Sequence, residues 1–152
     1  MDELEGITVS APLFLIATTQ TCNLCGKDNQ VVALATKNIK TGDNEEDDNG
    51  VGYLLSYVEE YPDEILQEVL TRQSNFEICD SASMGESYYM TVCDCGGHYG
   101  DHYAHKQLLD QAFRNPQELM VEKLPVEGKW VIVCGVSQSL SIADLIDRAM
   151  EA

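Results

Sequence analysis

The chain has 152 residues, 44 % of them hydrophobic, and a formal net charge of −17 from 9 Lys+Arg against 26 Asp+Glu. This length and hydrophobic content suit one globular domain, residues 1–152, and exclude a disordered chain. Nucleic acids and anionic membranes are bound through lysine and arginine, so the charge argues against both as direct partners. A protein partner with a basic surface fits the charge better.

No targeting segment is expected at the N-terminus. The chain begins MDELEG, which is acidic where a signal peptide carries positive charge, and the apolar run at 11–17 is too short to span a bilayer. We therefore expect a cytoplasmic protein. In a reducing cytosol the six cysteines are expected to be metal ligands or core residues rather than disulfides.

The first part of the chain predicts strands joined by turns. Residues 7–17 are expected to form a strand in which Pro12 marks an edge or a bulge. A turn with two cysteines separates it from a second apolar strand at 31–36. A polar, acidic loop is expected at 40–50, and a third strand at 51–58.

The later part predicts helices as well as strands. A helix at 61–73 begins with proline and acids, a second is expected from about 103 to 113, and a third at 139–152 begins with a serine cap. Further strands are expected at 75–79, 88–93, 118–124 and 129–135. This order predicts an α+β fold with a mixed or antiparallel sheet and two or three helices.

Two cysteine pairs predict a metal site. Cys22 and Cys25 form a C-x-x-C followed by glycine, and Cys93 and Cys95 form a C-x-C followed by two glycines. Glycine allows the tight turn that the first pair needs, and sulfur atoms two residues apart on a strand face the same side. Four thiolates at about 2.3 Å would complete a structural Zn²⁺ site. Such zinc-ribbon-like hairpins would tie distant segments together; the alternative is buried thiols or a redox pair.

Three histidines follow the second pair. His98, His102 or His105 could replace one cysteine as a ligand, and an open site of this kind would suggest a zinc-dependent hydrolase. Neither the H-E-x-x-H motif nor the motif of zinc deaminases is present, however. We therefore expect these histidines to lie at the surface or beside the ligands.

The two cysteine segments resemble those of a set of small, functionally uncharacterised bacterial proteins. Their pattern is approximately C-x-K-C-x-K-x-T-x-V-x-A-L, then Y-x-N-x-C-x-x-C-G-x-x-x-G-D-x-x-L-H. The resemblance covers about a third of the chain and implies zinc binding and a bacterial or phage origin, but no activity. This chain has one residue fewer between the second pair of cysteines and an alanine at 104 in place of leucine. The matching residues are Cys22, Cys25, Val32, Ala33, Leu34, Tyr89, Cys93, Cys95, Gly96, Gly100, Asp101 and His105.

The remaining cysteines, Cys79 and Cys134, have apolar neighbours and are expected to be core thiols. Nothing in their local sequence prepares a reactive thiolate.

An acidic loop offers a second candidate site. Its carboxylates do not have calcium-loop spacing, because the sixth residue from Asp43 is Asp48 and the twelfth is Leu54. Such a loop is either only solvated or forms a patch that binds lysine and arginine of a partner. The loop acids are Asp43, Glu45, Glu46, Asp47 and Asp48, and the helix that follows could extend the patch through Glu59, Glu60, Asp63, Glu64 and Glu68.

The cysteine motifs, the histidines and the charge suggest three possible functions. The first is a non-enzymatic, zinc-stabilised interaction module, for example an inhibitor from a phage or mobile element that binds a basic, nucleic-acid-binding protein. The second is a zinc hydrolase with an open cysteine and histidine site. The third, a zinc domain that binds nucleic acid, is disfavoured by the charge.

Overall fold

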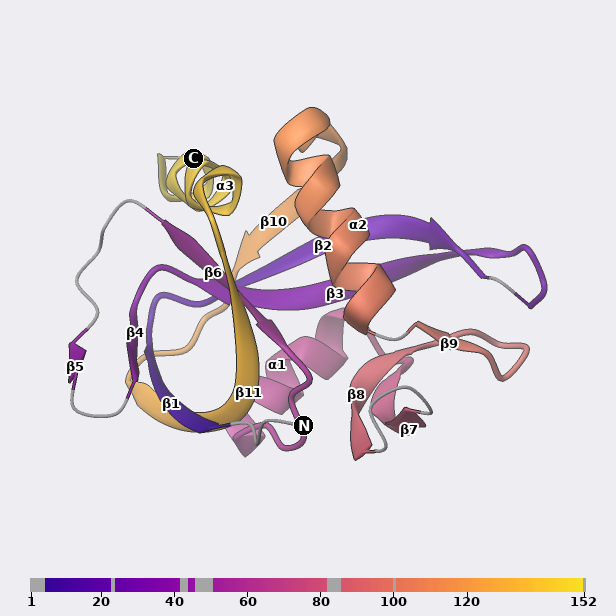
Figure 1. Cartoon of the computed structure of the whole chain (residues 1–152), viewed down its shortest axis with the longest axis horizontal. Helices are drawn as coiled ribbons and strands as arrows, with labels where there is room; N and C mark the ends of the chain where they lie inside the picture. Colours follow the sequence, from indigo (N-terminus) through magenta and orange to yellow (C-terminus); the bar gives the residue numbers. More distant parts are fainter. Residues whose placement is uncertain are drawn as a thin grey trace.

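The structure is a computed structural model that describes residues 5–22, 24–41, 44–45, 51–81, 86–99 and 101–151. These residues form two antiparallel sheets and three α-helices, which confirms the predicted α+β class (Figure 1). The large sheet contains, in spatial order, β10 (Met120–Lys123), β2 (Phe14–Thr21), β3 (Asp28–Thr36), β6 (Gly52–Ser56), β11 (Lys129–Ser139), β1 (Glu5–Ser10), β4 (Ile39–Thr41) and β5 (Asn44–Glu45).

The helices lie where the sequence predicted them. They are α1 (Asp63–Arg72), α2 (Asp101–Arg114), α3 (Leu140–Glu151) and a short 3₁₀ helix, η1 (Pro116–Glu118). The serine cap of α3 is Ser139, whose Oγ accepts the backbone N–H of Ile142 at 3.1 Å. Within the described ranges, none of these helices has the length and apolar character needed to cross a bilayer.

The central strands β2, β3 and β6 are apolar on both faces because both faces are covered. On one face, Leu15 and Leu55 belong to a core that also contains Ile65 of α1. On the other face, Phe14 and Leu54 pack against residues of α2 and α3. A strand buried on both sides has no polar face, which explains the continuous apolar runs in the sequence.

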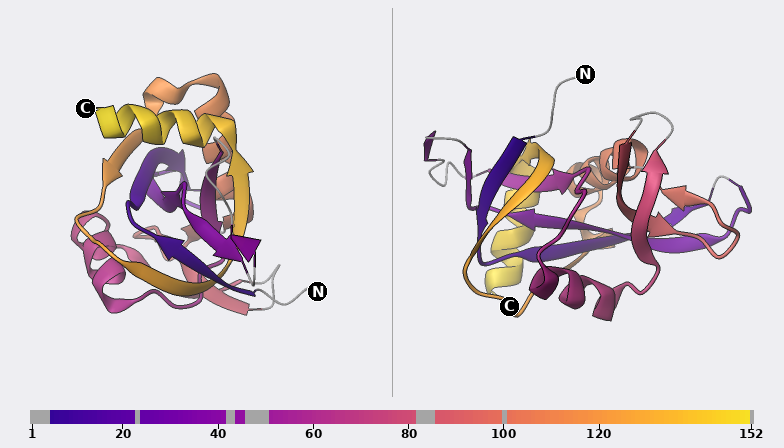
Figure 2. Two further views of the ribbon diagram at one scale, coloured as in Figure 1. Left: turned by 90° about the vertical axis from the view of Figure 1, so that its left-hand side faces the viewer. Right: turned by 90° about the horizontal axis from the view of Figure 1, so that it is seen from below.

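The large sheet curls back on itself. Two residues separate β3 from β4, yet β3 pairs with β2 and β6 whereas β4 pairs with β1. The long strand β11 pairs with β1 up to Cys134 and with β6 from Gly135 onward. Its change of partner bends the sheet, and both views in Figure 2 show β11 as a curved strand. Ile7 of β1 and Ile132 of β11 belong to the same core as Leu15 and Leu55, here called the first core.

The predicted strand at 7–17 is wrong in one respect, because it is two strands. β1 ends at Ser10 and β2 begins at Phe14, with a cis peptide bond before Pro12 between them. Proline has no N–H to donate to a strand ladder, so the pairing is interrupted there.

The small sheet has the order β7 (Phe76–Ser81), β8 (Glu86–Val92) and β9 (His98–Tyr99). It contacts the rest of the molecule through aromatic rings: those of Tyr61 and Tyr89 lie 5.2 Å apart, edge to face. The backbone N–H of Tyr89 also donates to the carbonyl of Val58 at 2.9 Å. The tyrosines of β8 therefore belong to the packed interior of this region.

Candidate metal centre

The four cysteines of the two motifs come together from two turns. Cys22 and Cys25 lie between β2 and β3, and Cys93 and Cys95 lie between β8 and β9. The sulfur atoms of Cys22 and Cys95 are 3.6 Å apart, and those of Cys25 and Cys93 are 3.5 Å apart. All four sulfur atoms, here called the sulfur cluster, lie within 4.8 Å of one another. The two hairpin ends lie side by side at the right of Figure 1.

The spacing of the sulfur cluster suits a shared metal ion. Four sulfur atoms bound tetrahedrally at about 2.3 Å are separated from one another by about 3.8 Å. The closest contacts, 3.5 and 3.6 Å, are near this separation, and each joins the two turns. Thiolates bind soft or borderline ions such as zinc, whereas calcium and magnesium require oxygen ligands. The donor set therefore fits zinc or iron.

The two turns hold their cysteines with similar backbone hydrogen bonds. The N–H of Cys22 donates to the carbonyl of Lys27 at 2.8 Å, and that of Cys93 donates to Gly97 at 2.7 Å. In return, Gly26 donates to the carbonyl of Cys22 at 3.0 Å, and the equivalent glycine after Cys95 donates to Cys93. In each turn the first cysteine thus both donates and accepts a backbone hydrogen bond, although the second motif is one residue shorter.

Glycine is required in both turns. Gly26 has a φ of 77° and Gly96 a φ of 95°, a region that residues with a Cβ rarely adopt. The sequence argument for the second pair was wrong in its reason, however. Cys93 and Cys95 lie beyond the last residue of β8, so the turn, and not the alternation of a strand, brings their sulfur atoms together.

Backbone amides stabilise the thiolate form of the first cysteine in each turn. The N–H of Cys95 is the main reason that the pKa of Cys93 is lowered to about 6. The N–H groups of Cys25 and Leu24 likewise lower the pKa of Cys22. These amides stabilise the negative charge of the thiolate, as a nearby positive charge does at reactive cysteines.

The pKa values of Cys25 and Cys95, the second cysteine of each turn, are raised instead, because negative charge accumulates in the cluster. The N–H of Lys27 lowers the pKa of Cys25, but the sulfur atoms of Cys93 and Cys95 outweigh it and raise that pKa to about 12. Four thiolates this close repel one another, and a bound cation removes that repulsion. The arrangement therefore favours full deprotonation only together with a metal ion.

A second layer of contacts joins the two hairpins around the cluster. The ammonium of Lys27 forms an ion pair with Asp94 at 2.5 Å. The hydroxyl of Tyr99 donates to the carbonyl of Gln20 at 3.1 Å and accepts a hydrogen bond from the amide of Asn29, also at 3.1 Å. Such contacts orient ligands and limit their movement. Sequence reasoning missed these residues, although opposite charges within the two cysteine motifs were a visible signal.

The histidines do not join the sulfur cluster in the described residues. His98 is exposed in β9, and neither it nor His105 is among the ligand atoms that lie together. His105 is buried in α2, where its Nδ1 lies 2.7 Å from the hydroxyl of Ser56. The side chain of His102 lies outside the described part of α2.

The two other cysteines differ from each other. Cys134 is 4 % exposed and belongs to the first core, as expected of a core thiol. Burial raises its pKa to about 12. Cys79 is only half-buried in the outer strand β7, so the expectation of a core thiol is wrong there. β7 is an edge strand with a neighbour on one side only, so its side chains are less covered than those of a central strand.

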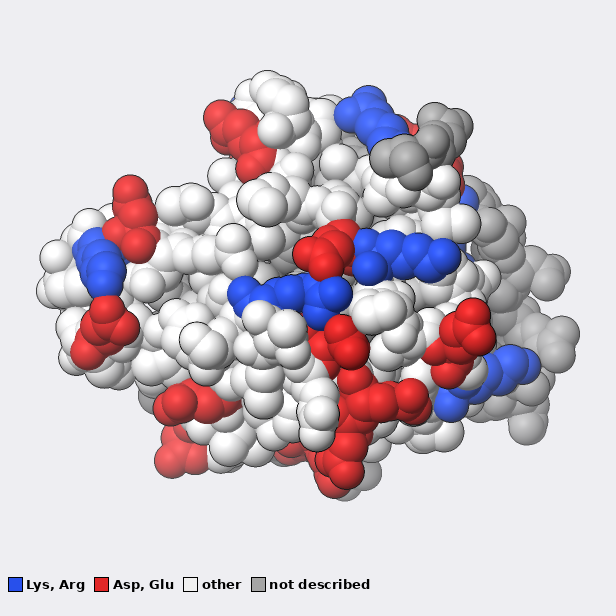
Figure 3. Space-filling model, turned by 180° about the vertical axis from the view of Figure 1, so that it is seen from behind, with Lys and Arg blue, Asp and Glu red and all other residues white. Residues whose placement is uncertain are grey.

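Most of the acidic loop lies outside the described residues. This applies to Asp43 and to the acids at 46–48, and only the backbone of Glu45 is described, within β5. The structure does describe the acids in α1 and just before it, and Glu60, Asp63 and Glu64 are exposed. Figure 3 shows acidic side chains gathered on one face of the molecule, with lysine and arginine among and above them.

Some of these acids are already paired within the protein. Arg72 contacts Glu68 in α1 at 2.9 Å and also forms an ion pair with Glu122 of β10. The indole N–H of Trp130 donates to Glu64. Of the exposed acids at and just before the start of α1, this leaves Glu60 and Asp63 available to a partner.

Comparison with known proteins adds no relatives: no family model, no curated protein and no solved structure matches this chain. The resemblance of the cysteine segments to small bacterial proteins stays a prediction.

Proposed function

We propose that the sulfur cluster holds one structural zinc ion and that the protein is a non-enzymatic module that binds a basic protein. The observation that supports the zinc ion most directly is the convergence of four cysteine sulfur atoms within 4.8 Å. Cys22, Cys25, Cys93 and Cys95 would fill all four positions of a tetrahedral zinc ion. Thiolate ligands of this kind suit a cytoplasmic, reducing environment.

A structural role is preferred to a catalytic one because of the ligand set. Catalytic zinc sites keep a position for water or substrate, usually with three protein ligands. Here four sulfur atoms are available, and the hydrogen bond of His105 to Ser56 directs that histidine to another contact. The zinc hydrolase is therefore the less favoured alternative.

The ion would fasten the small sheet to the large one. The two turns belong to different sheets, and α2 begins directly after β9. Because such a site does not form in the unfolded chain, its binding free energy adds to the free energy of folding. The metal would thus hold in place the segment that leads into α2.

The experiment is metal analysis of the purified protein together with thermal melts of three variants. We expect one zinc per chain, and Cys22→Ser or Cys93→Ser to lower the Tm by about 10 °C or more. The matched control is Cys79→Ser, which removes a half-buried cysteine outside the cluster and should change zinc content and Tm little.

Two results would count against a structural zinc ion. A chelator that removes the metal without lowering the Tm would exclude a structural role. Iron in place of zinc, seen by its visible absorbance, would reassign the ion, because four thiolates also bind iron.

The partner is proposed from charge. A net charge of −17 and the exposed acids at the start of α1 favour a protein rich in lysine and arginine. A phage or mobile-element inhibitor that occupies the nucleic-acid site of such a protein fits this chemistry. A gel shift at low salt separates this proposal from direct nucleic-acid binding: retention of labelled DNA or RNA by the protein alone would contradict it.

A further inference from the structure

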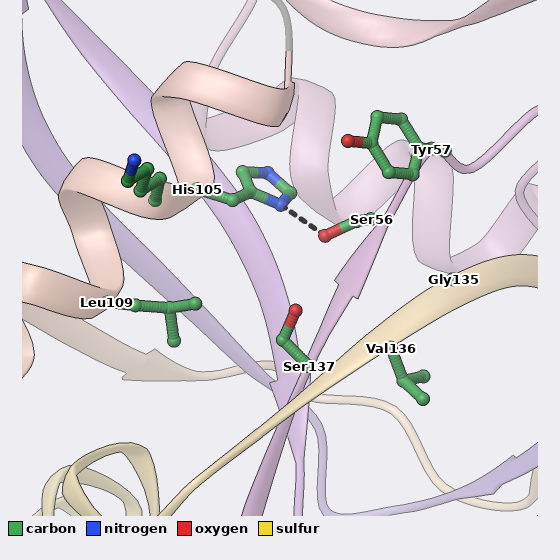
Figure 4. A pocket seen from close by; sticks show the side chains of 8 residues that line it. Ser56, Tyr57, His105, Leu109, Gly135, Val136 and Ser137 are labelled. Carbon is green, nitrogen blue, oxygen red and sulfur yellow. Dashed lines mark hydrogen bonds between the residues drawn. The ribbon is translucent and has the colours of Figure 1, made fainter. Parts of the chain in front are cut away.

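A cavity of about 290 Å³ lies where β6, β11 and α2 meet (Figure 4). None of the cysteines lines it. Ser56 ends β6 and pairs with Gly135, the first residue of β11 after that strand changes partner. The opposite wall comes from His105, Lys106 and Leu109 of α2. The volume is close to the lower limit for small-molecule sites.

Every polar side chain of the cavity can donate a hydrogen bond, although one proton is already used between Ser56 and His105, and the hydroxyls can also accept one. The polar groups are the hydroxyls of Ser56, Tyr57 and Ser137, the imidazole of His105 and the ammonium of Lys106. No carboxylate lines the cavity among the described residues. In a chain with 26 Asp+Glu, a lining with an ammonium group and no carboxylate suits a ligand that carries acceptor oxygens.

Two of these groups are buried and still face the cavity. Ser56 and His105 are each 6 % exposed, and the serine hydroxyl lies 2.7 Å from Nδ1 of the histidine. Figure 4 shows the hydroxyl of Ser137 directed toward this pair. A buried polar group needs a partner, and this hydrogen bond fixes both side chains at the cavity wall.

The backbone beside the cavity is strained. Tyr57 has a φ of 57°, which is unusual for an aromatic residue. Its ring contacts that of Tyr88 edge to face, with centroids 5.2 Å apart, and this contact helps to hold the conformation. Strained residues of this kind cluster at binding sites, where they fix the direction of neighbouring groups.

We propose that this cavity binds a short-chain aliphatic monocarboxylate. The carboxylate would accept hydrogen bonds from Ser137 and from Lys106 at the rim, while the aliphatic part would contact Leu109. Inorganic phosphate is a poorer match, because it has no apolar part to contact Leu109. It also carries more charge into a protein whose net charge is −17.

The test is a titration with isovalerate, followed by ¹H–¹⁵N NMR of the zinc-loaded protein at fixed pH and ionic strength. Saturable shifts are expected for the amides of Ser56, His105 and Ser137. Isovaleramide, which has the same shape without the charge, should bind at least about threefold more weakly. Inorganic phosphate should cause no saturable shift at these amides.

Two variants test the donors. Ser137→Ala and Lys106→Gln should each weaken isovalerate binding by about threefold or more, with the rest of the spectrum unchanged. Lys123→Gln changes an exposed lysine of β10 outside the cavity and should leave the Kd as it is. The proposal fails if isovalerate causes no saturable shift at the cavity, or if the amide or phosphate binds equally well.

Discussion

Gly97 lies directly against the sulfur cluster, in the second cysteine turn. A Cβ at this position would come within 3.2 Å of the sulfur of Cys22 and within 3.0 Å of Leu24. The leucine is 76 % exposed and can move aside, but the sulfur is fixed by its neighbours. Even a methyl group would therefore displace a sulfur atom of the cluster.

We predict that Gly97→Ala weakens metal binding by about tenfold, which is the lower end of the loss seen when the contacts that orient metal ligands are disturbed. The measurement is competition with a coloured chelator at constant pH. Gly6→Ala is the control: it places a Cβ 3.2 Å from the exposed Val131, far along the chain from the cysteines. Equal affinities for the two variants would show that the close approach at Gly97 is unimportant.

Cys134 gives a prediction of pH dependence. Burial raises its pKa from the ordinary 9.0 to about 12, so the folded protein keeps the proton while the unfolded chain loses it. Its contribution to stability is complete below pH 9 and is lost as the pH rises from 9 toward 12.

Urea unfolding between pH 9 and 11 should therefore show a steeper loss of stability for the natural protein than for Cys134→Val. The expected difference in slope is on the order of 1 kcal/mol per pH unit. Comparing slopes cancels the other groups that ionise in this range. Parallel slopes would mean that the thiol is accessible to water in the folded state.

At the scale of single residues, the sequence predicted which four cysteines come together but not their surroundings. Four cysteines in two glycine-flanked pairs are a local pattern, which can be recognised without knowing the fold. The contacts of Asn29 with Tyr99 and of Lys27 with Asp94 depend on how two hairpins are placed. That placement follows from packing over the whole molecule, which no short motif contains.

At the scale of elements, the capping of α3 can be tested separately from the metal. Ser139→Ala removes the acceptor for the N–H of Ile142 and should lower the free energy of unfolding by about 1 kcal/mol. Ser141→Ala, in the first turn of the same helix, is the control and should change stability by less than about 0.5 kcal/mol. Urea denaturation measures both, and equal effects would contradict the assigned cap.

Among the elements, the helices could be predicted from the spacing of apolar residues more closely than the strands. The three helices have apolar residues at helical spacing and lie within a few residues of their predicted positions. The strand predicted at 129–135 continues to Ser139, because its later residues pair with β6 and need no apolar run of their own. Pairing between strands that are distant in the sequence decides where such a strand ends, so the local sequence cannot predict that boundary.

At the scale of the whole molecule, the acidic loop gives a prediction about association. Changing the five loop acids to their amides moves the net charge from −17 to −12. We predict that folding is unchanged and that association with a basic partner becomes slower and less dependent on salt. Stopped-flow or surface-based kinetics at two salt concentrations measure this. The residues changed are Asp43, Glu45, Glu46, Asp47 and Asp48.

The control must separate local charge from total charge. A second variant with the same total charge changes five acids elsewhere, and it should slow association less. If both variants behave alike, the loop has no special role and only net charge steers the partner. The acids for this control are Glu77, Asp110, Glu118, Glu127 and Asp144.

The pairing of β1 with β11 has a consequence for synthesis of the chain. Its register joins Glu5 to Cys134 and Ser10 to Lys129. On the ribosome, one edge of β1 must wait for its partner until residues 129–134 have been synthesised. Long-range pairing of this kind slows folding and leaves an open strand edge exposed to other chains. We therefore expect the nascent chain to be more prone to aggregate during this interval than a protein built from local hairpins.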